Sequence, residues 1–561
     1  MANDQVRRHR AAASHAAFRR ASPGKTSHTS PKPAATLSAG VVYEMVRRWP
    51  KSLWQLPAVA KREGGLWLLS SEAIRMLPSD PPHGPFRHLY STSAAAPASS
   101  AAWGTIGKLP AVECARPPGA PLPPQALQLV RAGMCCLLEH ASLWPAAERS
   151  WHSAAYLRSG MRGAMCNVLS SPADGGRRFS YWFSHGDRVQ AGYQAKPLVS
   201  TLSMTIDAYF DACSDAHRDR AAIKPHAAAS PPVASERQCL YLQQTILQQT
   251  VLRPDGQGLM PCGGLVGAMA QDIEYGVDVA AIKALMDAGG FGSWTRSQLF
   301  VGSQTSGARS ILHFDQYDNV FVQIAGTKRF RIFDPEQTPY LYAYPVHHPL
   351  DTRSQVDLED PQVAETFPRL REARGTEIIL HPGQTLFLPA YWWHEVTTLP
   401  AAKVAYGVGH TAAQEPPLNV SVNFWFDVTP RLLSPTRPLV PSMRCELARQ
   451  LEYLVSDCLL DRAKHVPTLF AGLLAALEAA AVASSTSDAN KAEAAKVALP
   501  AARNALHAAR PVDVMEAEWD GLFEFVTSKF AELAGGGSLL TFARELCHPS
   551  RFAHLRLEKS R

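Results

Sequence analysis

Short apolar segments alternate with turn-forming residues through the middle of the chain. Seven segments of four to eight residues are rich in the β-branched and aromatic residues that strands favour. The candidate strands are Val320–Ala325, Lys328–Phe333, Glu377–Leu380, Thr385–Pro389, Val396–Leu399, Lys403–Val408 and Asn419–Phe426. Turn residues separate several of them, at Gly326, Pro382-Gly383 and Pro416-Pro417. This pattern predicts a mainly β domain built as a sandwich of short antiparallel strands.

Beyond the last predicted strand, the apolar residues follow a helical spacing instead. One apolar face is formed by Met443, Leu447, Leu451, Leu454 and Cys458, and a second lies within Val466–Leu477. A pair of helices cannot bury both faces against a finished sandwich. We therefore expect these helices to have a further partner.

These patterns divide the chain of 561 residues into five parts. A disordered basic tail is expected over 1–40, and a small apolar element with a Pro/Ala/Ser-rich linker over 41–104. The main β domain is expected over 105–428 and the paired helices over 429–477. An Ala-rich linker and a C-terminal helical extension are expected over 478–561.

The net charge of +7 is concentrated in residues 1–40, which hold seven basic residues and one acidic residue. The rest of the protein is nearly neutral, so nucleic acid is not favoured as a partner. The tail is rich in Arg, Ser and Ala. That composition fits either an organellar transit peptide or a plain disordered arm.

The ten cysteines include no CxxC pair and no spacing typical of disulfides. Reduced thiols are therefore expected, which favours an intracellular protein of the cytoplasm or nucleus. The basic tail leaves import into mitochondria or another organelle open. No uninterrupted apolar run reaches about 18 residues, so no membrane span is expected.

Three side chains have the spacing of a metal site. His313 and Asp315 fall on the same side of an extended segment, because successive strand residues alternate faces. His394 follows a predicted strand and turn, close to the start of the next strand. Two imidazoles and one carboxylate can bind Fe(II) on one face and leave the other face open, as in the facial triad of non-haem oxygenases. In a chain with 20 histidines, a chance His-x-Asp tripeptide is the alternative.

Lys328 lies in the apolar region that follows the first two ligands. The segment Val320–Ala325, the turn at Gly326 and the segment Arg329–Phe333 predict a hairpin that returns Lys328 to the side of the metal. A buried ammonium needs an anion, and a dicarboxylic co-substrate bound to the metal would supply one. The alternative is a solvated lysine on the hairpin.

With these residues the chain resembles a known family, the Jumonji C hydroxylases. Within this family, the chain resembles the asparaginyl hydroxylase called factor inhibiting hypoxia-inducible factor. Besides the triad and Lys328, the matching stretches are Leu240–Thr245, Phe291–Trp294, Tyr344–Pro349, Ser354–Asp357 and Val422–Trp425. They occur in the family's order over roughly residues 105 to 476. The resemblance implies a double-stranded β-helix, also called a jelly-roll or cupin fold, with flanking helices and a C-terminal helical region.

The resemblance also implies cofactors and the residues that bind them. His313, Asp315 and His394 would hold Fe(II), and the reaction would use O2 and the co-substrate 2-oxoglutarate. The implied 2-oxoglutarate ligands are Lys328, Tyr241 and Ser310 at its distal carboxylate, and Asn319 and Asn423 around its metal-chelating end. The helices over 429–477 match those that form a homodimer in the family.

Substrate residues are implied in the same way, and here the chain departs from the family. Gln243 and Tyr181 match positions that contact a substrate peptide, and Trp425 matches a tryptophan that lines the substrate side. The family member has an Arg-Gln pair that grips the target amide, whereas this chain has Thr352-Arg353. A guanidinium only donates hydrogen bonds, so Arg353 suits an acidic or carbonyl-presenting target better than an amide nitrogen.

Three classes of function follow from this reading. The first is a dioxygenase that hydroxylates an Asn, Asp or His side chain of a protein or peptide. The second is an oxygenase of the same family that acts on lysine or RNA, because the metal site is common to all of these. The third is a non-catalytic, metal-binding cupin module.

Overall fold

The structure is a computed structural model of the chain. It describes residues 102–105, 107–117, 119–172, 178–180, 199–222, 238–248, 259–304, 306–346, 348–400 and 417–428. It also describes 60–63 and 66–69, and, toward the C-terminus, 431, 442, 445–446, 449, 452, 465–484, 504, 507–508, 510–523, 526, 544, 547, 551–553 and 555.

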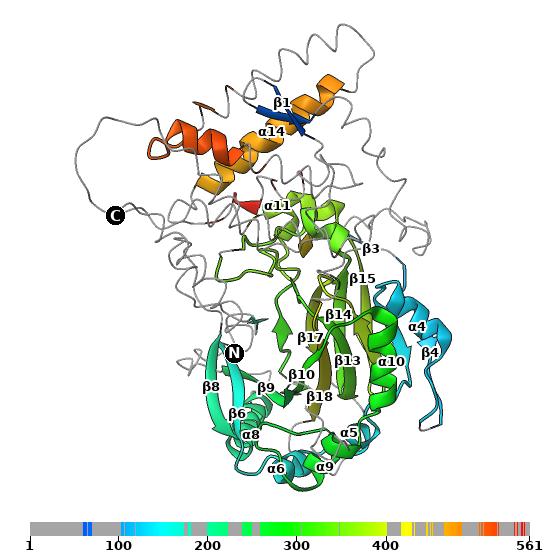
Figure 1. Cartoon of the computed structure of the whole chain (residues 1–561). Coiled ribbons are helices and arrows are strands. Elements are labelled where there is room, and N and C mark those ends of the chain that lie inside the picture. Colours follow the sequence, from blue (N-terminus) through cyan, green and yellow to red (C-terminus); the bar gives the residue numbers. More distant parts are fainter. Residues whose placement is uncertain are drawn as a thin grey trace, which may run out of the picture.

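Two β-sheets form the body of the protein (Figure 1). The larger sheet has the order β4 (Ala111–Glu113), β5 (Cys136–Glu139), β16 (Thr385–Leu388), β13 (Asp318–Ala325), β18 (Leu418–Phe426), β10 (Trp294–Ser303), β9 (Gln238–Gln248), β6 (Met165–Pro172) and β8 (Ser200–Thr205). The smaller sheet has the order β3 (Gly104–Thr105), β15 (Arg374–Leu380), β14 (Thr327–Phe333), β17 (Trp393–Leu399), β11 (Arg309–Ser310) and β7 (Arg178–Phe179), and β12 (His313–Phe314) also pairs with β17. This arrangement confirms the expected jelly-roll core.

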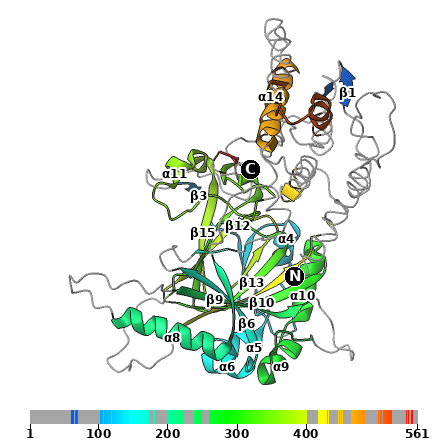
Figure 2. The same ribbon diagram turned by 90° about the vertical axis from the view of Figure 1, so that its left-hand side faces the viewer.

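Helices cover the outer face of the larger sheet (Figures 1 and 2). They are α4 (Pro124–Arg131), α5 (Pro145–Ser150), α6 (Ala154–Gly160), α8 (Ile206–Ala222), α9 (Gly267–Tyr275) and α10 (Val279–Gly289). The largest apolar core lies between these helices and the sheet, and it includes Trp144, Trp151, Phe424 and Phe426. Burial of such side chains contributes about 1.5–3 kcal/mol each, so this side of the sheet is the main source of stability.

The sequence located most of the strands but misjudged one connection. Gly326, with φ of 68°, makes the turn after β13, as expected. The strands on either side of it do not pair, however: β13 pairs with β16 and β18, and β14 pairs with β15 and β17. The predicted hairpin is therefore wrong, because the chain crosses at Gly326 from one sheet to the other. Lys328 still reaches the interior, since the crossing places its side chain between the sheets.

Two other strand predictions differ from the structure. The strand expected at Val396–Leu399 begins earlier, at Trp393, so His394 lies within it. The strand expected at Lys403–Val408 lies outside the described residues. Three short helices, η2 (Pro335–Tyr340), α11 (Val363–Thr366) and η3 (Pro368–Glu372), connect β14 to β15 at one end of the sandwich.

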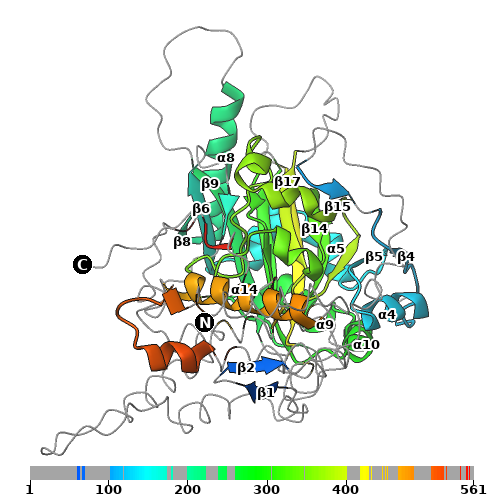
Figure 3. The same cartoon turned by 90° about the horizontal axis from the view of Figure 1, so that it is seen from above.

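Parts of the C-terminal region contact this same end of the sandwich. Arg449 donates two hydrogen bonds to buried Asp351, at 2.7 and 2.9 Å, and Gln355 donates to the carbonyl of Arg551 at 2.9 Å. The helix α14 (Val466–Ser484) lies beyond α11 in Figure 1, and Figure 3 shows α14 from above in orange. Five predicted interface residues lie outside the described part, namely Met443, Leu447, Leu451, Leu454 and Cys458, so the homodimer stays a prediction. The whole basic tail over 1–40 also lies outside it. No described helix is long and apolar enough to cross a membrane.

Candidate metal and co-substrate site

The three predicted metal ligands come together between the sheets. His313 of β12 and His394 of β17 are directly opposite each other in register, with ring centroids 4.2 Å apart. Asp315 follows β12, and its Oδ2 lies 3.7 Å from His394 Nε2. One candidate ligand atom from each residue lies within 4.8 Å of the other two. The three side chains therefore converge on one point, as a facial triad requires.

Both imidazoles are held with one ring nitrogen available to a metal. The Nδ1 of His313 lies 2.7 Å from the carbonyl of Ile311, and the Nδ1 of His394 lies 3.0 Å from the carbonyl of Trp392. Since a carbonyl only accepts, each Nδ1 carries the proton, and each Nε2 keeps its lone pair. Burial lowers the pKa of both rings, strongly for His313, where His394 and Arg353 act in the same direction. Neutral imidazoles of this kind fit Fe(II) binding.

A network around Tyr391 supports the ligands from behind. Tyr391 has a positive φ of 70°, and its N–H donates to the carbonyl of Asp315 at 2.8 Å. The Tyr391 hydroxyl donates to Glu446, a buried residue of the C-terminal region. An unfavourable backbone conformation persists only where its surroundings hold it. The C-terminal region therefore helps to position the loop that carries Asp315.

Lys328 lies farther inside the sandwich, 1% exposed. Its ammonium donates to the hydroxyls of Tyr241 at 3.0 Å and Ser421 at 2.6 Å. Aromatic rings surround it, and burial lowers its pKa to about 7. No carboxylate of the described residues forms an ion pair with it. A buried ammonium with neutral partners fits the distal carboxylate of 2-oxoglutarate, which would complete its pairing.

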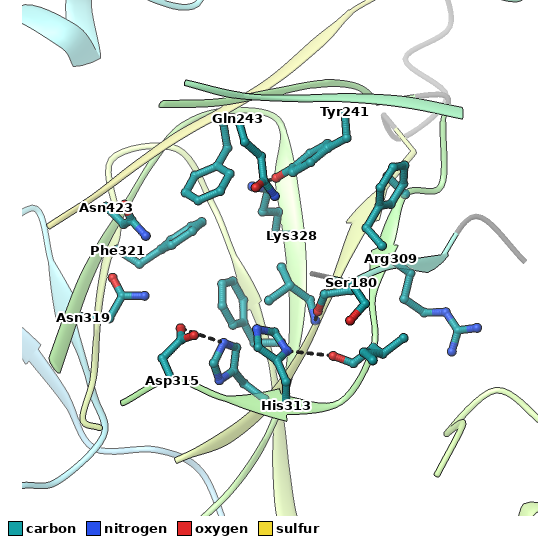
Figure 4. A pocket seen from close by; sticks show the side chains of 18 of the residues that line it. Ser180, Tyr241, Gln243, Arg309, His313, Asp315, Asn319, Phe321, Lys328 and Asn423 are labelled. Atoms are coloured by element: carbon teal, nitrogen blue, oxygen red, sulfur yellow. Dashed lines mark hydrogen bonds and ion pairs between the residues drawn. The ribbon is translucent and has the colours of Figure 1, made fainter. Parts of the chain in front are cut away.

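The other predicted co-substrate residues line the same pocket (Figure 4). Ser310 accepts a hydrogen bond from the N–H of Val396 at 2.9 Å. Asn423 Oδ1 accepts from the N–H of Gln298 at 3.1 Å, whereas Asn319 Oδ1 is buried without a partner. The pocket has a volume of about 110 Å³, which is room for several water molecules. Its size and donor set fit a small dicarboxylic acid.

The predicted substrate residues lie at the same pocket where they are described. Gln243, Trp425 and Arg353 all line it, and Tyr181 lies outside the described residues. Arg353 is 4% exposed, and its Nε donates to Ser180 Oγ at 3.2 Å. Its Nη1 donates to the Asp351 carbonyl and to Thr352 Oγ1, both at 2.7 Å. The guanidinium is thus held inside the site rather than in solvent.

Sequence reasoning missed several residues that complete the site. Ser421 holds Lys328, and Ser180 holds Arg353. Ser421 could have been found, because it lies two residues before Asn423 and so faces the same side of β18. Ser180 gave no such signal, since β7 has only two residues and pairs with β11 from far along the chain. Arg309 also lines the pocket, but its guanidinium pairs with Asp357 and Glu395.

Comparison with known proteins places this site in a family. A model of the cupin-like domain matches residues 128–431. HSPB1-associated protein 1 of Bos taurus is 34% identical over 136 residues, which cover 24% of each chain. Lysine-specific demethylase 8 of Xenopus tropicalis is 36% identical over 121 residues, which cover 22% of this chain and 23% of the relative.

A further relative is tRNA wybutosine-synthesizing protein 5 of Danio rerio, 34% identical over 97 residues, which cover 17% of this chain and 26% of the relative. The matched segments thus span about a quarter of each of these curated relatives. The family model covers more than half of the chain. The chain belongs to the cupin-like domain family.

Proposed function

We propose that the protein is an Fe(II)- and 2-oxoglutarate-dependent dioxygenase that hydroxylates an Asn, Asp or His side chain of a protein or peptide. The observation that carries this proposal is the pairing of two features in one pocket. His313, Asp315 and His394 offer three converging ligands, and Lys328 offers a buried cation that has no carboxylate partner among the described residues. A metal-binding module without turnover would have no use for the second feature.

Each group has a distinct task in this reaction. The triad would hold Fe(II), which would supply the oxygen chemistry that converts 2-oxoglutarate to succinate and carbon dioxide while one oxygen atom enters a C–H bond of the substrate. Lys328, Tyr241 and Ser310 would bind the distal carboxylate and so fix the orientation of the co-substrate. Asn319 and Asn423 would hydrogen-bond near its other end. The apolar walls Phe321, Phe330 and Leu388 exclude water.

Arg353 affects which target side chain the pocket favours. It presents only donors at the pocket, so a carboxylate or carbonyl satisfies it and an amide nitrogen does not. Asp, or Asp together with Asn, is therefore favoured over Asn alone, although the resemblance to the asparaginyl hydroxylase points to Asn. Arg353 also disfavours a methylated lysine, because two cations would meet in a small buried space.

A direct assay tests this proposal. Purified protein with Fe(II) and 2-oxoglutarate is incubated with ankyrin-repeat-like peptides that carry Asn, Asp or His at one position, and products are identified by mass spectrometry. We expect a mass gain of one oxygen, strongest for Asp, and a shift toward Asn in Arg353→Gln. Exclusive hydroxylation of Asn, unchanged in Arg353→Gln, would refute the role of Arg353. Methyl-lysine peptides and tRNA are the competing substrates, and turnover of either in place of the peptides would favour the second class of function.

The same family resemblance supports a homodimer formed by the helices over 429–477. Light scattering of the full chain tests this expectation. A monomeric mass at micromolar concentration would exclude it.

A further inference from the structure

Four buried polar atoms without a hydrogen-bond partner lie together on the inner face of the larger sheet. They are Arg296 Nε, Gln298 Oε1, Asn319 Oδ1 and Trp425 Nε1. In native proteins most buried polar atoms are paired, so a group of unpaired ones calls for a ligand or water. Of the four residues, only Asn319 has a proposed role at the co-substrate, near its metal-chelating end.

Strand register explains why these atoms form one patch. Arg296 of β10 lies opposite Trp425 of β18, and Trp425 lies opposite Asn319 of β13. Gln298 of β10 lies opposite Asn423 of β18. Directly opposite residues share a face, and residues two apart on one strand do so too. Because Asn319, Asn423 and Trp425 line the pocket, the patch is continuous with the candidate active site.

Arg296 is the charged member of this patch. Its guanidinium lies 4.4 Å from the centroid of the Trp425 ring and 5.8 Å from that of Tyr317, and these two rings are 5.3 Å apart. The guanidinium is therefore held by aromatic faces. It forms no ion pair and no hydrogen bond with any described residue, and an arginine cannot shed its charge. It stands beside the pocket as a fixed cation that has no anionic partner in the part of the chain that the structure describes.

From this arrangement we propose that Arg296 and Trp425 form a subsite for an acidic side chain of the polypeptide substrate. The proposal rests on the proposed function and specifies its substrate class. Arg296 Nε and the Trp425 indole Nε1 only donate, so a carboxylate satisfies both of them. The unpaired oxygens of Gln298 and Asn319 only accept, so N–H groups of the same peptide satisfy them. An Asp or Glu beside the target residue would supply that carboxylate while the target reaches the metal.

Two observations favour a peptide carboxylate over the phosphates of a nucleic acid. The patch is largely buried, so it accepts one inserted group rather than a chain of phosphates. Outside residues 1–40 the protein is also nearly neutral, whereas binding of a polyanion draws on several cations.

Peptide selection tests the subsite directly. A library of random twelve-residue peptides is selected on protein loaded with Mn(II) and 2-oxoglutarate, which does not require turnover. The wild type should enrich Asp or Glu at one fixed position, and Arg296→Met should lose that enrichment. The control Arg158→Met removes another arginine that stacks on an aromatic ring, Phe210, far from the pocket, and should keep it.

Calorimetry with one selected peptide then isolates the contact. Replacing its acidic residue by the amide should weaken binding to the wild type about ten- to a hundredfold, as expected for a charge-assisted hydrogen bond. Binding to Arg296→Met should be equally weak for both peptides. Arg296→Lys, which keeps the charge, should regain part of the discrimination even if Arg296→Met folds poorly.

Several results would overturn the subsite. They are selection without acidic residues, equal discrimination by wild type and Arg296→Met, preference for single-stranded RNA in competition, and loss of 2-oxoglutarate affinity in Arg296→Met. The last result would assign Arg296 to the co-substrate. Failure of the proposed function itself would look different: acidic peptides would bind as described, but the Fe(II) protein would not hydroxylate them.

Discussion

Two cations, Lys328 inside the pocket and Arg296 beside it, are held in opposite ways. One face of β18 connects the two cations through Ser421, Asn423 and Trp425. Ser421 contacts Lys328, and Trp425 contacts Arg296. At the lysine end, Lys328 is 1% exposed among hydroxyls and aromatic rings, and burial lowers its pKa to about 7. At the arginine end, the guanidinium is only partly buried and lies on aromatic faces.

The difference follows from the chemistry of the two side chains. A lysine can shed its proton, so the lysine end tolerates the absence of an anion by becoming neutral. An arginine stays charged, so the arginine end relies on aromatic rings and some solvent. We infer that the lysine end is shaped for one small co-substrate, and the arginine end for a group that arrives with a larger molecule.

The largest expected effect comes from the metal ligands between the two ends. His313→Ala or Asp315→Ala should reduce 2-oxoglutarate decarboxylation below detection, because a facial triad with two ligands binds Fe(II) weakly. Circular dichroism should show an unchanged fold, since the Asp315 side chain is 20% exposed and its supporting contact to Tyr391 uses the backbone. Turnover like that of the wild type in either variant would contradict the assignment.

Removal of the buried ammonium should weaken binding of 2-oxoglutarate and leave peptide binding nearly unchanged. Lys328→Ala leaves the distal carboxylate of 2-oxoglutarate unpaired in a buried site, at a cost of about 3–5 kcal/mol, or more than a hundredfold in affinity. The KM for 2-oxoglutarate should rise by that factor, and the KM for peptide should change little. Lys283→Ala on α10, where the side chain is 70% exposed, is the matched control. An unchanged KM for 2-oxoglutarate would show that Lys328 does not bind it.

The pH dependence of co-substrate binding should distinguish the two cations. Lys328 must be protonated to pair with a carboxylate, and its pKa in the free protein is about 7. Above that pH, binding must therefore take up a proton, and affinity for 2-oxoglutarate should fall by up to about tenfold per pH unit. Calorimetry of the Mn(II) protein in buffers of different ionisation enthalpy measures this uptake. Lys328→Met should abolish it, and proton release on binding would contradict the prediction.

The smallest effect is expected at the arginine end. Trp425→Phe keeps an aromatic ring under Arg296 but removes the indole N–H, which is worth about 0.5–1.5 kcal/mol as a hydrogen bond. The KM for an acidic peptide should rise about two- to tenfold, with the KM for 2-oxoglutarate unchanged. Trp103→Phe, which alters a ring packed on Phe333 rather than the pocket, serves as the control. Equal effects of the two variants would remove Trp425 from substrate recognition.

Residue types and their local spacing predicted the chemistry of the site, although they did not give its three-dimensional geometry. His313, Asp315, His394 and Lys328 were found because their residue types and spacing already carry the chemistry of metal and carboxylate binding. Gln243, Asn319, Asn423, Trp425 and Arg353 followed from resemblance, and all of them line the pocket. The sequence could not give Ser180 as the partner of Arg353, because a hydroxyl acquires a role only from the side chain that lies beside it.

The sequence by itself determined a mainly β fold, and it predicted three candidate metal ligands and an anionic partner for Lys328. These depend on residue type and on spacing within a few positions, which the chain encodes locally. Only the tertiary structure decided that Gly326 leads from one sheet to the other and not through a hairpin. It also decided that Arg296, Gln298, Asn319 and Trp425 form one patch, since they come from three strands whose neighbours and register are set by long-range pairing.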